Sequence, residues 1–160
     1  MSTNAASQTM WRIRDMNYEL AFASSTSNKE KADDITKNLK YGKGWLSKEN
    51  CSYPQELVFE LRKVSIVDMV ELISHPECSP DIVDLHIGTP RTDDFRLPLK
   101  LLREDFDFPK IKSGCFQKVE RNPSKKGELL ELKCDPETEG SVIVLRIMGY
   151  QNNAMNTKKQ

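Results

Sequence analysis

Apolar residues recur at every second position in several short segments of this chain, and this period constrains the fold more than any other feature. Side chains of a β-strand point alternately to its two faces, so such alternation is typical of strands that cover a core with one face. The segments are bounded by proline, glycine, asparagine or aspartate, which favour turns. The segments with the clearest alternation are Tyr18–Phe22, Leu57–Leu61, Ile66–Ile73, Ile82–Ile87, Leu129–Cys134 and Val142–Met148.

Turn signals separate these segments. His75-Pro76 follows the third, Gly88-Thr89-Pro90 closes the fourth, and Asp135-Pro136 indicates a turn after the fifth. Seven or eight strands in about 140 residues predict an all-β, antiparallel jelly-roll β-sandwich. One short helix is expected near the N-terminus, from Asn28 to Leu39. Residues 97–104 fit a helix or a strand, and the register of residues 91–121 stays open.

Charge and hydropathy exclude some classes of protein. The 24 lysines and arginines balance 24 aspartates and glutamates, so the net charge is zero and a globally basic nucleic-acid binder is disfavoured. No segment approaches the roughly 20 apolar residues of a membrane-spanning helix. Four separated cysteines without a CxxC pair or a signal peptide indicate free thiols in a reducing compartment. We therefore expect a cytoplasmic protein without cofactors.

The polar ends of the chain suggest its domain organisation. Residues 1–14 are expected to form a flexible tail, residues 15–150 one jelly-roll domain, and residues 151–160 a tail or a linker into a longer protein.

Several motifs resemble those of the discoidin (coagulation factor 5/8 type C) jelly roll, which has the galactose-binding-like fold. Ala23-Ser24-Ser25 looks like the opening serine motif of that family, Gly44-Trp45-Leu46-Ser47 like its tryptophan loop, and residues 144–150 like its closing strand. Within the superfamily, the chain is most similar to the N-terminal jelly rolls of the 104-kilodalton centrosomal and ciliary-tip protein family. The block Cys51-x-x-Pro54-Gln55-Glu56-Leu57-Val58 and the segment Asp81–Gly88 carry that likeness.

The resemblance has limits as well as implications. Extracellular discoidin domains join their termini by a disulfide, whereas this chain has no cysteine near either end. That difference fits the intracellular branch. The resemblance implies a ciliary or centrosomal protein whose partners include tubulin or other ciliary-tip and centrosomal proteins.

The tryptophan loop is the first candidate binding surface. Trp45 could anchor a partner, because tryptophan concentrates binding energy at interfaces. Alternatively, it packs inward, as in the resembling family, with its N–H bonded to a backbone carbonyl. Lys40, Lys43 and Lys48 surround the loop and would suit an acidic tail of tubulin type, unless they form an ordinary solvated loop.

A second candidate surface is Phe106 and Phe108, which would share one face of a strand and form a docking strip if exposed, or belong to the core if buried.

Metal sites have little support. Asp33 and Asp34 are weak calcium candidates, because calcium needs six to eight oxygens and adjacent carboxylates in a helix diverge. His75, Cys78 and His86 offer zinc ligands only superficially, since His86 is expected to alternate outward on its strand.

No motif of a hydrolase, metalloprotease or nucleotide-binding enzyme occurs, and pairs such as Asp93-Asp94 and Asp105/Asp107 lie in charged, turn-rich sequence. The sequence therefore predicts a non-catalytic protein-interaction domain. The alternatives are a small-ligand or carbohydrate-binding module, and an intracellular scaffold in DNA repair or ubiquitin ligation.

Overall fold

The protein is seen in a computed structural model that describes residues 18–26, 45, 47–74, 80–90, 107–116 and 128–150. Within these ranges the chain forms strands and no helix, so nothing in them could cross a membrane as a helix. The expected helix at 28–39, the segment 97–104 and both expected tails lie outside the described residues. The strands are β1 (Tyr18–Ala23), β2 (Gln55–Ser74), β3 (Ile82–Gly88), β4 (Lys110–Cys115) and β5 (Glu128–Ile147).

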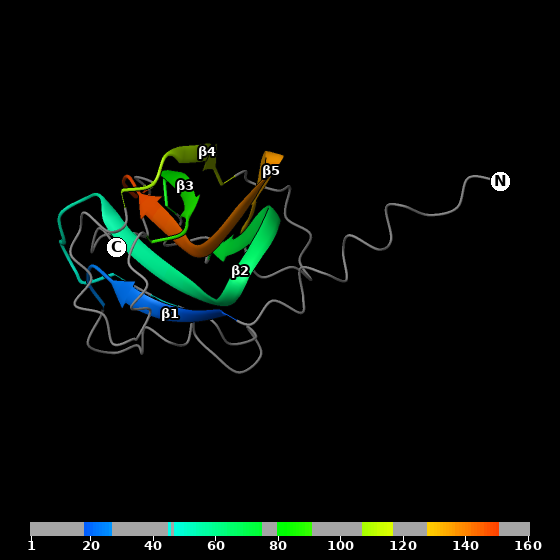
Figure 1. Ribbon diagram of the computed structural model, residues 1–160. Helices are drawn as coiled ribbons and strands as arrows, with labels where there is room; N and C mark the ends of the chain where they lie inside the picture. The colour runs from blue at the N-terminus through cyan, green and yellow to red at the C-terminus, as the bar shows by residue number, and fades with distance from the viewer. Residues whose placement is uncertain are drawn as a thin grey trace.

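All of these strands pair antiparallel in one sheet, in the order β1-β2-β5-β3-β4. β5 comes last in the described sequence but lies in the middle of the sheet, between β2 and β3. Figure 1 shows β2 and β5 side by side as long, curved ribbons. Such non-sequential neighbours are typical of jelly rolls and sandwiches rather than of simple meanders.

β2 and β5 each continue for 20 residues because bulges absorb the breaks seen in the sequence. Their register shifts between Glu60 and Ser65, and again between Val67 and Met69. Extra residues on one strand of an antiparallel pair bend that strand without ending it. The expected turn at Asp135-Pro136 is therefore wrong. Pro136 lies within β5 at the second shift, where its missing N–H costs no regular ladder bond.

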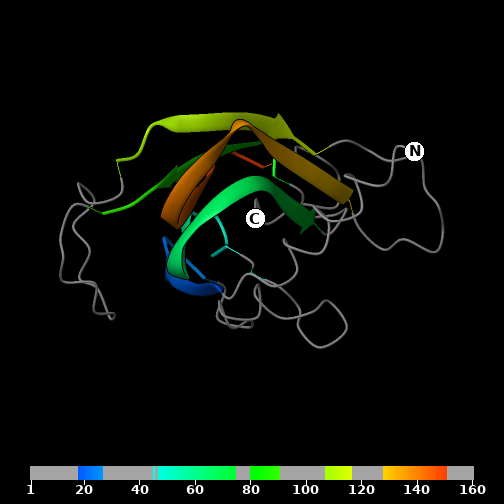
Figure 2. The same ribbon diagram turned by 45° about the vertical axis from the view of Figure 1, so that its right-hand side comes forward.

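Bending folds the sheet over on itself, and the first half of β5 packs face to face against β4 (Figure 2). A Cβ added to Gly114 of β4 would lie 2.6 Å from Leu132 and 2.8 Å from Leu130 of β5. Contacts this short mean that the two layers are in direct contact at that glycine. The predicted antiparallel β-sandwich is confirmed.

The main core lies between the two layers. It consists of alternate residues of β2, β3 and β5, as the period of two predicted, together with Phe116, which directly follows β4. Its buried members are Leu57, Phe59, Leu61, Val67, Val83, Leu85, Ile87, Phe116, Leu130, Leu132, Cys134, Ile143, Leu145 and Ile147.

A second buried cluster lies on the opposite face of the same strands, which we call the outer face. It consists of Val58, Val142 and Val144, each at most 2% exposed, with Ala21 and Phe108 packed against them. The central strands are thus buried on both faces, which explains why residues 142–145 read as a continuous β-branched and aliphatic run.

Candidate interaction surface at the tryptophan-loop end

Trp45 lies at the end of the sheet where β1 and β5 end and where β2 and β3 begin. We call this region the tryptophan-loop end. The indole is partly buried against the main core, and its Nε1–H donates a 2.8 Å hydrogen bond to the carbonyl oxygen of Ser25. This geometry matches the inward-packing alternative, because the polar edge of the indole is occupied within the domain.

Two consecutive serines tie the loop to the start of β2. The backbone N–H of Ser24 donates to the carbonyl of Glu56 at 2.9 Å, and the N–H of Glu56 donates to Ser24 Oγ at 2.8 Å. Ser25 Oγ donates to Gln55 Oε1 and accepts a bond from the N–H of Lys48. The serine motif, the tryptophan loop and the Pro-Gln-Glu block, which are far apart in sequence, therefore meet in one hydrogen-bonded node.

Tyr53 and Tyr150 form a ring pair beside this node. Their centroids are 5.7 Å apart and their planes are tilted by 46°. Burial raises the pKa of the Tyr53 hydroxyl to about 12, because it disfavours the phenolate. Tyr150 also forms a β-bridge with Pro80, which holds the chain beyond β5 against the segment before β3.

Two exposed apolar side chains continue this surface. Ile82 is 37% exposed and Met148 is 43% exposed, and the N–H of Met148 donates to the carbonyl of Ile82 at 2.9 Å. Cys115, also exposed, lies opposite Ile82 in the β3–β4 register. Large exposed apolar groups that adjoin one another are typical of contact surfaces.

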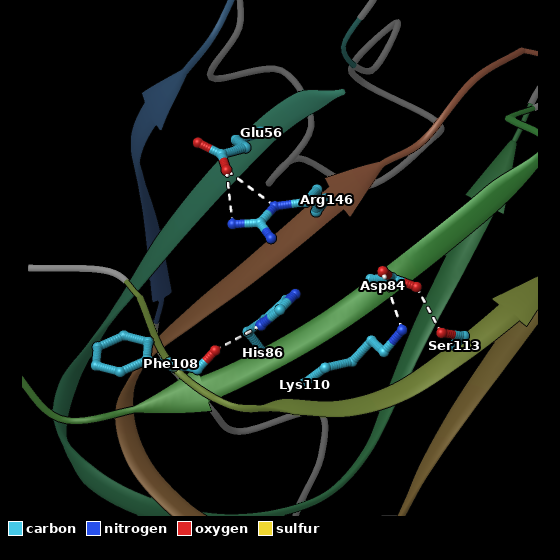
Figure 3. A network of polar contacts seen from close by, with 7 residues as sticks. All are labelled: Glu56, Asp84, His86, Phe108, Lys110, Ser113 and Arg146. Atoms are coloured by element: carbon cyan, nitrogen blue, oxygen red, sulfur yellow. Dashed lines mark hydrogen bonds and ion pairs between the residues drawn. The ribbon is translucent and has the colours of Figure 1, made fainter. Parts of the chain in front are cut away.

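Charged side chains of β2, β3, β4 and β5 lie on the outer face (Figure 3). Arg146 of β5 binds Glu56 of β2, with Nε and Nη2 both 3.0 Å from the same carboxylate oxygen. Asp84 of β3 accepts a hydrogen bond from Ser113 and lies 3.5 Å from Lys110 Nζ, both on β4. Each carboxylate is largely buried and has a cationic partner, so one ion pair links β2 to β5, the other links β3 to β4, and neither carboxylate is left without a cation.

His86 lies on the outer face, as its alternation with Leu85 predicted, but the expectation that it points outward to solvent is wrong. Its side chain is buried because the outer face is covered, and its Nδ1 lies 2.7 Å from the carbonyl oxygen of Phe108. A carbonyl only accepts, so Nδ1 carries the proton. Within the described ranges no three metal-ligating side chains gather, and His75 and Cys78 lie outside them.

Of the predicted contact residues, Lys48 is exposed beside the tryptophan loop. Phe108 precedes β4 and is half-buried against the outer-face valines, in agreement with the core alternative. Lys40, Lys43, Phe106, Asp33 and Asp34 lie outside the described residues. Three of the four cysteines are described, and Cys51, Cys115 and Cys134 are free thiols as expected.

Sequence reasoning missed the outer-face network and the tyrosine pair. A usable signal existed, since Asp84 and Arg146 each lie among apolar residues, in the expected strands 82–87 and 142–148, where an unpaired charge would be costly. Their cross-strand proximity, however, depends on register. Asp84 and Arg146 are direct partners only because β3 pairs with β5 across more than fifty intervening residues.

The fold and the hydrogen-bonded tryptophan loop define a galactose-binding-like jelly-roll domain. The structure of reduced XRCC1 bound to the DNA polymerase β catalytic domain matches with a TM-score of 0.58 at 10% identity, covering 89% of both chains. The family 32 carbohydrate-binding module of NanJ from C. perfringens, in complex with galactose, matches with a TM-score of 0.58 at 11% identity, over 86% of this chain and 85% of that one. At such identities the likeness shows the fold alone.

Sequence comparison is more specific. Residues 44–160, more than two thirds of the chain, match the model of the family described as "Centrosomal protein CEP104, N-terminal domain". The chain therefore belongs to the family of CEP104 N-terminal domains, and the resemblance inferred from the Pro-Gln-Glu block is confirmed. No curated protein matches the chain.

Proposed function

We propose that this domain is a non-catalytic protein-interaction module of a ciliary or centrosomal, microtubule-associated assembly, and that its tryptophan-loop end is a contact surface. Family membership supports the centrosomal setting. The observation that carries the proposal is the pair of exposed apolar side chains, Ile82 and Met148, beside the Tyr53–Tyr150 pair. A surface of aromatic and apolar side chains on rigid strand ends suits protein recognition.

The hydrogen-bonded node supports this role by fixing the loop. Ser25, Gln55 and Trp45 hold the polypeptide in place through side chains rather than through a regular ladder. A fixed surface loses little conformational entropy on binding, so more of the contact energy appears as affinity. Tubulin and ciliary-tip or centrosomal proteins are the proposed partners.

Proximity labelling in ciliated cells tests the proposal with the variant Met148→Glu, which places a charge on the contact surface. Val64→Glu is the matched control, because Val64 is 48% exposed at the bend of β2, away from the strand ends. We expect Met148→Glu to lose labelling of centrosomal proteins or tubulin and Val64→Glu to keep it. In the same assay, the double variant Lys40→Glu/Lys43→Glu tests whether the lysines of the tryptophan loop contribute to this contact.

Equal labelling by Met148→Glu and Val64→Glu would move the contact to another face. If the unmodified chain labelled no cytoskeletal or centrosomal protein, the interaction role itself would be wrong. Thermal unfolding of each variant separates loss of binding from loss of folding.

A further inference from the structure

β4 lies at the end of the sheet, and one side of it is unpaired within the described residues. One hydrogen-bonding edge of β4 pairs with β3 from Ile82↔Cys115 to His86↔Lys110. No described strand pairs with the other edge, which we call the free edge of β4. An edge strand presents backbone N–H and C=O groups that can pair with a strand from another chain.

This edge is basic in a chain of zero net charge. Lys110 and Lys112 are both exposed. From Lys110 to Gly127 the sequence holds six lysines and arginines against a single glutamate, a net charge of +5. The structure places two of these lysines, Lys110 and Lys112, on β4, so the described edge itself carries basic side chains that would attract an acidic partner.

The two lysines lie on opposite faces of β4. Lys112 is opposite Leu85 of the main core, so it shares the inner face, whereas Lys110 reaches Asp84 on the outer face (Figure 3). The shift between Leu85 and His86 in the β3–β4 register produces this arrangement. A strand added along β4 would therefore meet Lys112 on one face and, on the other, Lys110, which is also the ion-pair partner of Asp84.

The other side chains of β4 are small or packed against the rest of the domain, so they leave the edge accessible and hold the strand in place. Ser113 and Gly114 are small, and Gly114 is fixed by contact with Leu130 and Leu132. Ile111 packs against the main core. A rigid edge flanked by small side chains allows another backbone to approach closely.

We propose that the free edge of β4, the edge that does not pair with β3, binds an acidic, extended segment of a partner protein by strand addition. Backbone hydrogen bonds to β4 hold the segment, and its carboxylates face Lys110 and Lys112. Because successive side chains of a strand point to opposite faces, a segment with acidic residues at adjacent positions fits better than one with acids at alternate positions. The proposal goes beyond the loop-end role, because it concerns another surface and can hold or fail independently.

The test titrates the whole 160-residue, ¹⁵N-labelled chain with a ten-residue, glutamate-rich peptide and with the same peptide carrying glutamine in place of glutamate. We expect chemical-shift changes and slowed amide exchange in residues 110–115 with the acidic peptide alone, weakening as salt is raised. Lys112→Glu should weaken binding at least about fivefold, and Lys112→Gln by less. Lys63→Glu is the matched control, an exposed lysine at the β2 bend, and should bind like the unmodified chain.

Four outcomes would overturn the proposal. These are no binding, equal binding of the glutamine peptide, shifts centred outside β4, and equal displacement by single-stranded oligothymidine, which would indicate unspecific attraction of anions. No binding would mean that the edge lysines only discourage strand pairing. The loop-end role would be untouched, because the Met148→Glu labelling experiment reads it separately.

Discussion

Arg146 and Glu56 face each other across β5 and β2, and two guanidinium nitrogens lie 3.0 Å from one carboxylate oxygen. Their side chains are 26% and 18% exposed, so the pair is mostly shielded from water. Replacing Arg146 by leucine leaves the carboxylate without its cation. We expect Arg146→Leu to lower the free energy of unfolding by about 2 kcal/mol in urea titration.

Arg62 provides the control for that measurement. It lies 3.8 Å from Glu19, and both side chains are 70% exposed. Exposed pairs contribute little, so Arg62→Leu should change the free energy of unfolding by less than about 0.5 kcal/mol. Equal losses in the two variants would contradict the assignment of the Arg146–Glu56 pair as stabilising.

Phe108 lies directly over Gly88, where an added Cβ would collide with the phenylalanine ring. Gly88→Ala should therefore push the ring from the outer-face valines and lower the thermal unfolding temperature, with a cost of about 2 kcal/mol. Gly149→Ala is the control, since a Cβ there meets Asp81 at 3.9 Å, an ordinary contact. If Phe108→Leu in the Gly88→Ala background restores no stability, the collision is not the cause.

Trp45→Phe keeps an aromatic ring but removes the Nε1–H that bonds the Ser25 carbonyl. We expect a loss of about 1 kcal/mol in chemical unfolding, because one partly buried acceptor loses its donor. Amide exchange should quicken near Ser25 and Lys48 while β3 and β4 stay protected. Unchanged exchange at Ser25 would show that the indole bond does not hold the loop.

Glu60 has a raised pKa, because burial disfavours its carboxylate and the Glu19 charge opposite it adds repulsion. Because the pKa of Glu60 is higher in the folded than in the unfolded protein, the unfolded chain loses this proton first. The free energy of unfolding therefore falls as pH rises above the ordinary pKa of 4.5. Glu60→Gln should therefore stabilise the protein by about 0.5 kcal/mol at pH 7 and have little effect near pH 4. Urea titrations at both pH values measure the difference. A variant less stable than the parent at pH 7 would contradict the repulsion.

Burial raises the pKa of the Tyr53 hydroxyl in the folded protein to about 12 from its ordinary value of 10.0. Between these values the unfolded chain loses the proton and the folded chain keeps it, so stability falls as pH rises from 10 toward 12. Tyr53→Phe should remove this part of the loss. Tyrosinate absorbance near 295 nm, followed with unfolding between pH 9 and 11.5, tests it. Identical pH profiles for parent and variant would exclude the burial effect.

Local pattern predicted much of the fold. The alternation in residues 57–61 and 82–87 correctly predicted strands, and their alternate residues Leu57, Phe59, Leu61, Val83, Leu85 and Ile87 do lie in the main core, because successive side chains of a strand point to opposite faces. The end of β2 before His75-Pro76 and the end of β3 at Gly88 also followed from turn residues. Whether a break ends a strand or only bends it was not predictable. Asp135-Pro136 looks like a turn, but pairing with β2 on both sides of it keeps β5 continuous.

Part of the candidate site was also predictable from the sequence, and part of it was not. Its components were recognisable as motifs, namely the serine pair, Trp45 and the Pro-Gln-Glu block, because each depends on residue type at short spacing. Their meeting in one node was not predictable from spacing, since it joins residues that are 20 to 32 positions apart. The burial of His86 was not predicted, because alternation along a strand indicates the face on which a residue lies and not whether that face is covered.

The sequence by itself determined the class of the domain, its family and which residues of each strand share a face, since these depend on local residue order. Only the tertiary structure decided that Glu56 meets Arg146, that Phe108 covers Gly88 and that Lys110 and Lys112 lie on opposite faces of an edge strand. The physical reason is that register and bulges between distant strands set these contacts. Register is determined by the packing of all faces together rather than by any one segment.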